Sequence, residues 1–339
     1  PPRTPVPRPA TPVPAAPAGC SPEYPADYYA PLTQPTMPAL PEFPALAAPA
    51  RPKVGVVLGS GGIKAFGGIP LFELLEREGI TIDLLVGCSG GSVVCAGVGA
   101  GYTTAEMRAL LPELLERSLF EQRDYRTLLG IVSPKLGRFD KTSAILKPDG
   151  IQRIYHEQLR GVRLEHMRPR TLIQTTDLLT GEGVVLSQGL AADAVYASGA
   201  FFPVLPPLYV DGRWLADGVY SAPIPVLEAV KRNMDVIIAV DFKERVTSEP
   251  RGFLDCFHRY ADSAMATLKR SQMFLAIEMH HYEIINIEVA FDHAVNLRDV
   301  EELPAILAAG EQAVAAQQGE ILAAIRNFTS AHQVEAAKL

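Results

Sequence analysis

A stretch of 22 residues without a charged side chain, from Leu84 to Ala105, most limits how this chain can fold. Its length alone would suit a membrane-spanning helix, which needs about 20 apolar residues. However, six glycines (positions 87, 90, 91, 97, 99 and 101) and a polar centre from Ser89 to Ser92 would make a poor lipid-facing helix. The stretch therefore predicts a buried strand, a sharp turn and a buried helix, and no membrane span.

The elements predicted around this stretch alternate between strand and helix. An apolar run at 54–58 leads into a glycine-rich loop at 59–68 and a helix at 69–78, and a second strand at 80–86 leads into a helix at 92–101. Further strands are predicted at 171–176, 183–186, 235–240 and 282–289, and further helices at 104–118, 149–159, 224–232, 253–280 and 303–328. Because such crossovers are right-handed and cover both faces of a parallel sheet, this order predicts a three-layer α/β/α fold with a mostly parallel central sheet.

Proline content divides the chain into two parts. Residues 1–50 hold 16 of the 29 prolines and predict a flexible arm or linker, with an interaction tail as the alternative. Residues 51–339 are expected to form one α/β domain with a sizeable core. The chain begins at Pro1 rather than at methionine, so we expect a processed or trimmed product. The surroundings of Cys20 match a bacterial lipidation site only weakly, because no apolar run precedes it, and we do not expect lipidation there.

Charge and cysteine content narrow the classes of partner. Lys and Arg number 31 against 38 Asp and Glu, and the resulting net charge of −7 argues against a nucleic-acid partner and a polybasic membrane anchor. Cys20, Cys88, Cys95 and Cys256 lack metal-ligand spacing and are too few for a disulfide scaffold. We therefore expect no metal or other cofactor, and a location in the cytoplasm or at the periphery of a membrane.

The turn inside the uncharged stretch has the composition of a nucleophile elbow. Gly87-Cys88-Ser89-Gly90-Gly91 fits Gly-x-Ser-x-Gly and lies between an apolar strand and a helix of small residues. A nucleophile at such a turn adopts strained backbone angles and needs small neighbours, here Gly87 and Gly91. The following helix also directs its N-terminus at developing negative charge. These features predict that Ser89 is a catalytic nucleophile.

The glycine-rich loop from Gly59 to Lys64 is the candidate for binding an anion. Consecutive glycines let backbone N–H groups approach an anion closely, as an oxyanion hole requires. A phosphate cradle is the alternative function for such a loop. The loop lacks Gly-Lys-[Ser/Thr], however, and does not spell the dinucleotide fingerprint with an acidic residue at the end of the next strand. An oxyanion hole is therefore the favoured interpretation.

The sequence offers two kinds of base for Ser89. The histidines that follow it are His156, His166, His258, His280, His281, His293 and His332, and none lies in an obvious strand-end loop flanked by small residues. Asp211-Gly212 predicts a type I′ hairpin turn between two short apolar runs. Asp217-Gly218 follows the second of these two runs, and no hairpin turn explains its presence there. This favours Asp217 as the base.

Taken in order, the glycine-rich loop, Gly87-x-Ser89-x-Gly91 and Asp217-Gly218 resemble the patatin-like phospholipase family. The similarity runs from about Val54 to Phe242 and is greatest to bacterial members. Members of this family hydrolyse acyl esters with a Ser–Asp dyad and no catalytic histidine, which the resemblance places on Ser89 and Asp217. It places the oxyanion loop on Ser60 and on Gly61, Gly62, Ile63 and Lys64, where Lys64 stands in the position of the usual arginine.

The resemblance implies lipid or lysophospholipid substrates, met at a membrane surface by transient contact, and leaves the oligomeric state open. Two other functions stay open as well. One is a Ser-His-Asp esterase that uses His258 or His293, and the other is a catalytically weak binding module that acts through the Pro-rich arm. Transfer to an acyl carrier is disfavoured, because Cys88 stands where such enzymes usually have histidine. Hydrolysis through Asp217 requires burial to raise the pKa of this carboxyl from about 3.9.

Two apolar segments have no assigned partner in the sequence. Residues 199–209 are apolar and rich in proline, and they suit an acyl pocket, a lipid surface or the core equally. Residues 253–279 form a long predicted helix, for which packing against the sheet is favoured over membrane contact.

Overall fold

The computed structural model describes residues 51–115, 122–125, 127, 129, 140–245, 249, 252–281, 283–296 and 299–336. These residues belong to one compact unit within Ala47–Leu339. The Pro-rich arm at 1–50 and the end of the helix predicted at 104–118 lie outside the described residues, so the division of the chain at residue 50 stays a prediction.

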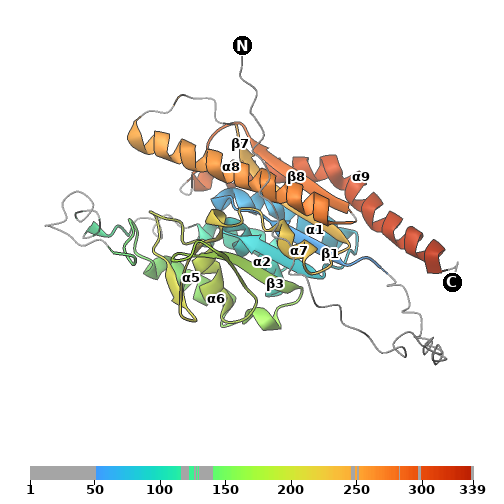
Figure 1. The fold of residues 1–339 in the computed structure, drawn as a ribbon, viewed down its shortest axis with the longest axis horizontal. Coiled ribbons are helices and arrows are strands. Elements are labelled where there is room, and N and C mark those ends of the chain that lie inside the picture. Colours follow the sequence, from blue (N-terminus) through green and yellow to red (C-terminus); the bar gives the residue numbers. More distant parts are fainter. Residues whose placement is uncertain are drawn as a thin grey trace, which may run out of the picture. The chain divides into compact units, whose positions relative to one another are not determined.

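An eight-stranded sheet forms the centre of this unit (Figure 1). Its strands are β1 (Val54–Leu58), β2 (Leu84–Cys88), β3 (Arg170–Asp177), β4 (Gly183–Leu186), β5 (Leu208–Val210), β6 (Arg213–Asp217), β7 (Val236–Glu244) and β8 (Glu283–Phe291). The strands β3-β2-β1-β7-β8 run parallel in this order, whereas β4 and β6 pair with β3, and β5 with β6, in antiparallel fashion. Because β1 and β2 are buried at every position, their sequences are continuous apolar runs.

Helices cover both faces of the sheet, which confirms the predicted three-layer α/β/α fold. They are α1 (Ile69–Arg77), α2 (Gly90–Gly99), α3 (Thr104–Leu114), α5 (Asp149–Leu159), α6 (Ala191–Ser198), α7 (Val226–Val230), α8 (Phe253–Met279) and α9 (Leu303–Ala336). Successive residues of β1 meet different layers, because side chains alternate along a strand. Val56 packs in a core with α1, α2, α3 and α9, whereas Val57 packs in a core with α7 and α8.

Several helices and strands begin or end at other residues than predicted. The helix predicted from residue 92 begins at Gly90, directly after Ser89. The strand predicted at 235–240 continues to Glu244, because β8 pairs with it over its whole length. The predicted hairpin is confirmed: β5 and β6 pair antiparallel, and Asp211 and Gly212 both have positive φ. No helix in the described part of the chain is both long and apolar enough to cross a bilayer.

Strand β3 brings the two predicted catalytic residues together. Gln174 pairs with Cys88 of β2 on one edge of β3 and with a residue of β4 on the other. Thr175 pairs with Asp217 of β6 and also with a residue of β4, so β6 lies on the same edge as β2. The two strands therefore meet end to end beside β3, and Ser89, which follows β2, faces Asp217, which ends β6.

Candidate active site

Ser89 occupies a strained turn between β2 and α2. Its backbone has φ 52° and ψ −124°, a conformation that residues other than glycine rarely adopt. Its N–H donates a hydrogen bond to Ser198 Oγ at 2.8 Å, and the Ser198 hydroxyl donates in turn to the Gln174 carbonyl at 2.6 Å. Ser198 is fully buried, so this relay holds the turn from inside the fold. It fixes the position from which Ser89 Oγ points into the site.

Two predicted elbow glycines lie where no side chain fits. A Cβ atom added to Gly91 would lie 2.6 Å from the carbonyl oxygens of Leu58 and Gly59, and one added to Gly87 would lie 2.6 Å from the Cα atom of Ser92. Both contacts are with backbone, which cannot move aside. Glycine at these positions lets α2 start directly against the end of β1.

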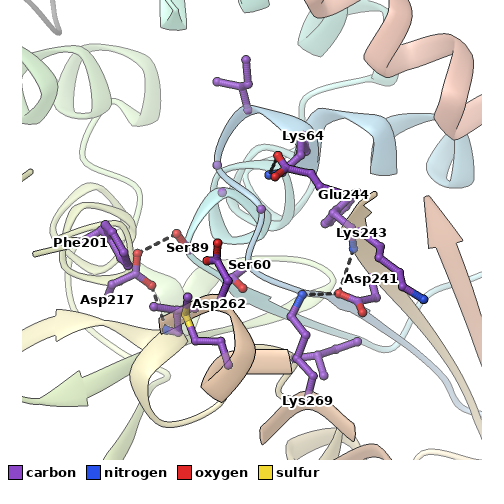
Figure 2. A pocket seen from close by; sticks show the side chains of 18 of the residues that line it. Ser60, Lys64, Ser89, Phe201, Asp217, Asp241, Lys243, Glu244, Asp262 and Lys269 are labelled. Atoms are coloured by element: carbon purple, nitrogen blue, oxygen red, sulfur yellow. Dashed lines mark hydrogen bonds and ion pairs between the residues drawn. The ribbon is translucent and has the colours of Figure 1, made fainter. Parts of the chain in front are cut away.

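Asp217 is the hydrogen-bond partner of Ser89 in the structure. Ser89 Oγ donates to Asp217 Oδ2 at 2.8 Å, and the Val219 N–H donates to Asp217 Oδ1 at 2.9 Å (Figure 2). The Asp217 side chain is almost completely buried. Burial raises the pKa of the Asp217 carboxyl to about 7, against the two hydrogen bonds, which lower it. A carboxylate with this pKa accepts a proton effectively near neutral pH.

The glycine-rich loop offers backbone donors beside the nucleophile. The Ser60 N–H donates to the Pro223 carbonyl at 2.7 Å, which holds the start of the loop. Within the described residues, the N–H groups of Gly61, Gly62 and Ile63 have no hydrogen-bond acceptor. All three line the same cavity as Ser89. Unpaired N–H groups in this place are available to an oxyanion.

Lys64 has a different environment from its neighbours in the loop. Its ammonium group forms an ion pair with Glu244 of β7 (Figure 2). Glu244 also accepts a hydrogen bond from the Val295 N–H at 2.9 Å. The Lys64 N–H donates to the Gly61 carbonyl at 3.1 Å. Both groups of Lys64 are thus engaged in holding the loop in position.

A cavity of about 1000 Å³ opens over Ser89 and Asp217. One part of its wall is apolar and includes Phe66, Val93, Leu114, Leu115, Ile151, Phe201, Val204, Leu205, Val219 and Ile224. The other part is rich in charge and includes Asp241, Lys243, Glu244, Arg259, Asp262, Lys269, Arg270 and Glu288. Strands β7 and β8, helix α8 and Lys64 of the glycine-rich loop supply the charged part, and α8 also contributes the apolar side chains of Met265, Met273 and Phe274.

Two apolar segments of the sequence contribute to this cavity. In the loop at 199–209, Phe201, Val204 and Leu205 line the wall, which favours the acyl-pocket interpretation for them. The expectation that residues 253–279 pack against the sheet holds for one face of α8, where Met273 and Ala276 join the core around Val57 and Ile237. Among the described side chains of α8, Ala276 is buried, whereas Phe274 and Ile277 are more than half exposed. The helix also lies along the cavity and supplies part of its wall.

Several residues of the site were not assigned by sequence reasoning. Ser198 belongs to a small-residue stretch that resembles the family, but nothing in the sequence indicates its bond to Ser89. Asp241 follows the apolar part of β7, and Lys269 of α8 is its ion-pair partner, with 2.5 Å between Lys269 Nζ and Asp241 Oδ1. The two residues are 28 positions apart, and no spacing rule connects them.

The histidines with described side chains lie away from Ser89. His156 pairs with Asp193 (3.0 Å), His280 Nε2 lies 3.3 Å from the Asp235 carbonyl oxygen, and His293 pairs with Glu302 (3.4 Å). Among the described residues, no histidine lines the cavity. The side chains of His258 and His332 lie outside the described part of the structure.

The cysteines are buried or half-buried and unbridged where the structure describes them. Burial raises the pKa of the Cys95 thiol to about 12, which leaves it unreactive. Over the described residues, no group of three or more histidine, cysteine, aspartate or glutamate side chains has the arrangement of a metal site.

The buried carboxyl of Asp217 makes the stability of the protein depend on pH. Its pKa is about 7 in the folded chain and about 3.9 when unfolded, so the folded state binds this proton more tightly. This contribution to stability is complete below about pH 4 and is lost as the pH rises through about 7. We expect Asp217→Asn to stabilise the protein relative to wild type by an amount that grows over this range, by on the order of 3–4 kcal/mol.

Urea unfolding of both proteins at several pH values measures this difference. The matched control is Asp211→Asn, the same substitution in the exposed hairpin turn. A difference between Asp217→Asn and wild type that does not change with pH would show that the Asp217 carboxyl has an ordinary pKa.

Comparison with known proteins places this geometry in a family. The family model described as patatin-like phospholipase matches residues 56–230, a segment that contains both Ser89 and Asp217. An uncharacterised NTE family protein of Mycobacterium tuberculosis (strain ATCC 25618 / H37Rv) is 31% identical over 189 residues, which are 56% of this chain and 49% of the relative. Lysophospholipase NTE1 of Scheffersomyces stipitis is 27% identical over 202 residues, which are 60% of this chain but 12% of that protein.

A solved structure agrees on the fold. Human GIVD cytosolic phospholipase A2 aligns with 84% of this chain and 63% of its own, at 12% identity and a TM-score of 0.50. The matched region spans about half the length of the mycobacterial relative. On the match of the family model, this chain belongs to the patatin-like phospholipase family.

Proposed function

We propose that this protein hydrolyses fatty-acyl esters of phospholipids or lysophospholipids through a Ser89–Asp217 dyad and an acyl-enzyme. The observation that carries the proposal is the 2.8 Å hydrogen bond from Ser89 Oγ to a buried carboxylate, at the base of a large cavity with an apolar wall. A hydroxyl bonded directly to a base of matched pKa is the arrangement of an activated nucleophile.

In the proposed reaction, Asp217 accepts the proton of Ser89 as Oγ attacks the ester carbonyl carbon. The tetrahedral intermediate then collapses, the carbonyl re-forms, and Asp217 returns the proton to the departing alcohol oxygen. Asp217 next takes a proton from water as the water oxygen attacks the acyl-serine carbonyl carbon. When the second tetrahedral intermediate collapses, the bond to Ser89 Oγ breaks, Asp217 returns the proton to Oγ, and the fatty acid and free Ser89 are released. Because the pKa of Asp217 is about 7, it can both accept and return a proton near neutral pH.

Backbone donors support the charged intermediate in this proposal. The free N–H groups of Gly61, Gly62 and Ile63 lie on the same cavity wall as Ser89. Helix α2 begins at the next residue, Gly90, and its dipole places partial positive charge at the same point. Neither group has to reorganise as the charge develops, which is the condition for strong electrostatic stabilisation.

The divided cavity supports a lipid that carries a charged head group. The Lys269–Asp241 pair is largely buried in its charged part, with side chains 18% and 20% exposed. Burial and the Asp217 carboxylate raise the pKa of the Cys88 thiol, whereas the positive charge of Lys269 lowers it. The charge of Lys269 is therefore felt at the residue next to Ser89. A phosphodiester next to the scissile ester would meet Lys269 there. The name lysophospholipase, carried by the relative from Scheffersomyces stipitis, agrees with this chemistry.

The dyad is tested by single substitutions assayed on a short-chain chromogenic ester and a lysophospholipid. We expect Ser89→Ala and Asp217→Asn each to lower kcat at least about a thousandfold, because each removes one half of the activated nucleophile. His258→Ala and His293→Ala should keep the wild-type rate. Thermal unfolding of each variant confirms that it is folded.

Loss of activity in either histidine variant would support a Ser-His-Asp esterase instead. If folded wild-type protein turned over neither substrate, the binding-module interpretation would gain support. Removal of residues 1–50 would then test whether the Pro-rich arm carries the binding.

The head-group preference is tested by Lys269→Met. We expect kcat/KM for a lysophospholipid to fall about tenfold, while kcat/KM for a monoacylglycerol with the same acyl chain falls much less, because that substrate has no phosphate to bind. Lys231→Met is the matched control, since Lys231 forms an exposed ion pair with Glu228 outside the cavity. An equal fall for both substrates in Lys269→Met would mean that Lys269 positions α8 and does not select the head group.

A further inference from the structure

We propose that a second, inner cavity between α2 and α3 receives the end of the substrate's acyl chain and sets the preferred chain length. This inference rests on the proposed function, which names the acyl ester but not the path of its chain. The inner cavity has a volume of about 40 Å³ and is lined by Phe66, Val93, Gly97, Tyr102, Met107, Leu110, Leu111, Leu114, Tyr155, Gln158, Leu159 and Val195.

The inner cavity adjoins the large one that holds Ser89. Phe66, Val93, Leu114 and Tyr155 line both, so these four side chains form the partition between them. They come from four separate elements: the 3₁₀ helix Gly62–Gly68 and helices α2, α3 and α5. A chain that passes between these side chains continues from the catalytic cavity into the inner one.

One face of α2 leads from the nucleophile to the inner cavity. Ser89, Val93 and Gly97 follow each other at intervals of four residues, and residues so spaced share a helix face. Ser89 lines the large cavity, Val93 lines both, and Gly97 lines the inner one. At 1.5 Å per residue, Gly97 is about 12 Å along the helix from Ser89. A short acyl group on Ser89 ends near Val93, whereas a long one reaches Gly97.

The wall of the inner cavity suits hydrocarbon. None of its residues is charged, and the polar side chains of Tyr102 and Gln158 are bonded to the protein. The Tyr102 hydroxyl donates to the Gln158 carbonyl at 2.6 Å, and the Gln158 amide donates to Glu113 at 2.9 Å. A charged head group would find no partner here and would lose its hydration, so methylene groups fit this cavity and head groups do not.

Gly97 explains why the inner cavity exists. Glycine inside a helix weakens it relative to alanine, so a glycine in this place needs another reason. A Cβ atom at Gly97 would lie 3.3 Å from Met107 Cε, across the space between α2 and α3. A larger side chain would therefore fill the inner cavity. Met107 is flexible and can move as a chain enters.

The test is Gly97→Leu, which fills the inner cavity while leucine favours the helix more than glycine does. We expect the ratio of kcat/KM for a dodecanoyl ester to that for a butanoyl ester to fall at least tenfold. Gly319→Leu is the matched control: Gly319 also lies inside a helix, α9, but it has open space around it and lines neither cavity. This control should keep the wild-type ratio.

A second variant enlarges the cavity. We expect Met107→Ala to raise the ratio of kcat/KM for an ester with a chain longer than dodecanoyl to that for the butanoyl ester by about threefold or more. The reason is that this substitution removes the side chain opposite Gly97. If Gly97→Leu were folded and its ratio unchanged, the acyl chain would have to leave Ser89 by another route, such as along α8, and the proposal would be wrong.

Failure of the proposed function can be told apart from failure of this inference. If wild type hydrolysed neither ester, the function would be wrong, and the inner cavity would then be judged by binding of a fluorescent fatty acid. At least tenfold weaker binding to Gly97→Leu than to Gly319→Leu would support the cavity as a hydrocarbon site. Equal binding to the two variants would overturn it.

Discussion

The site depends on one topological constraint: β2 and β6 meet end to end on the same edge of β3. Gln174 and Thr175 are adjacent in β3, and they pair with Cys88 and Asp217 respectively. This register places Asp217 opposite the turn that carries Ser89, although the two residues are 128 positions apart. The strained backbone of Ser89, the buried Ser198 relay and the glycine contacts of α2 all serve to hold one hydroxyl against this one carboxylate.

The same burial that activates Asp217 works against stability. A carboxylate taken out of water loses hydration, and two hydrogen bonds, from Ser89 and Val219, replace only part of it. The pKa of about 7 records this imbalance. The strands on either side provide a rigid surrounding in which such a group can persist, since β2 is completely buried and the end of β6 is buried from Leu215 to Asp217. Stability is thus lowered at the point where reactivity is needed, as is common at functional sites.

Much of this could be predicted from the sequence, and the physical reasons are local. The buried strands are continuous apolar runs, the turn at Ser89 is marked by glycines that only close backbone contact explains, and Asp211-Gly212 carries the angles of its hairpin. Predictions were incomplete where distant contacts decide. The end of β7 is fixed by its pairing with β8, and the role of α8 is fixed by the cavity beside it, so neither follows from periodicity.

The sequence by itself determined the fold class, the nucleophile turn and the carboxylate candidate, because strand burial and tight turns restrict which residues can occupy single positions. Tertiary structure alone decided what surrounds Ser89. It buried Asp217 enough to raise its pKa, joined Lys269 to Asp241, and opened an inner cavity opposite Gly97. These features arise between segments that are remote in the chain, and electrostatics and packing act through distance in space, which no local pattern of residues records.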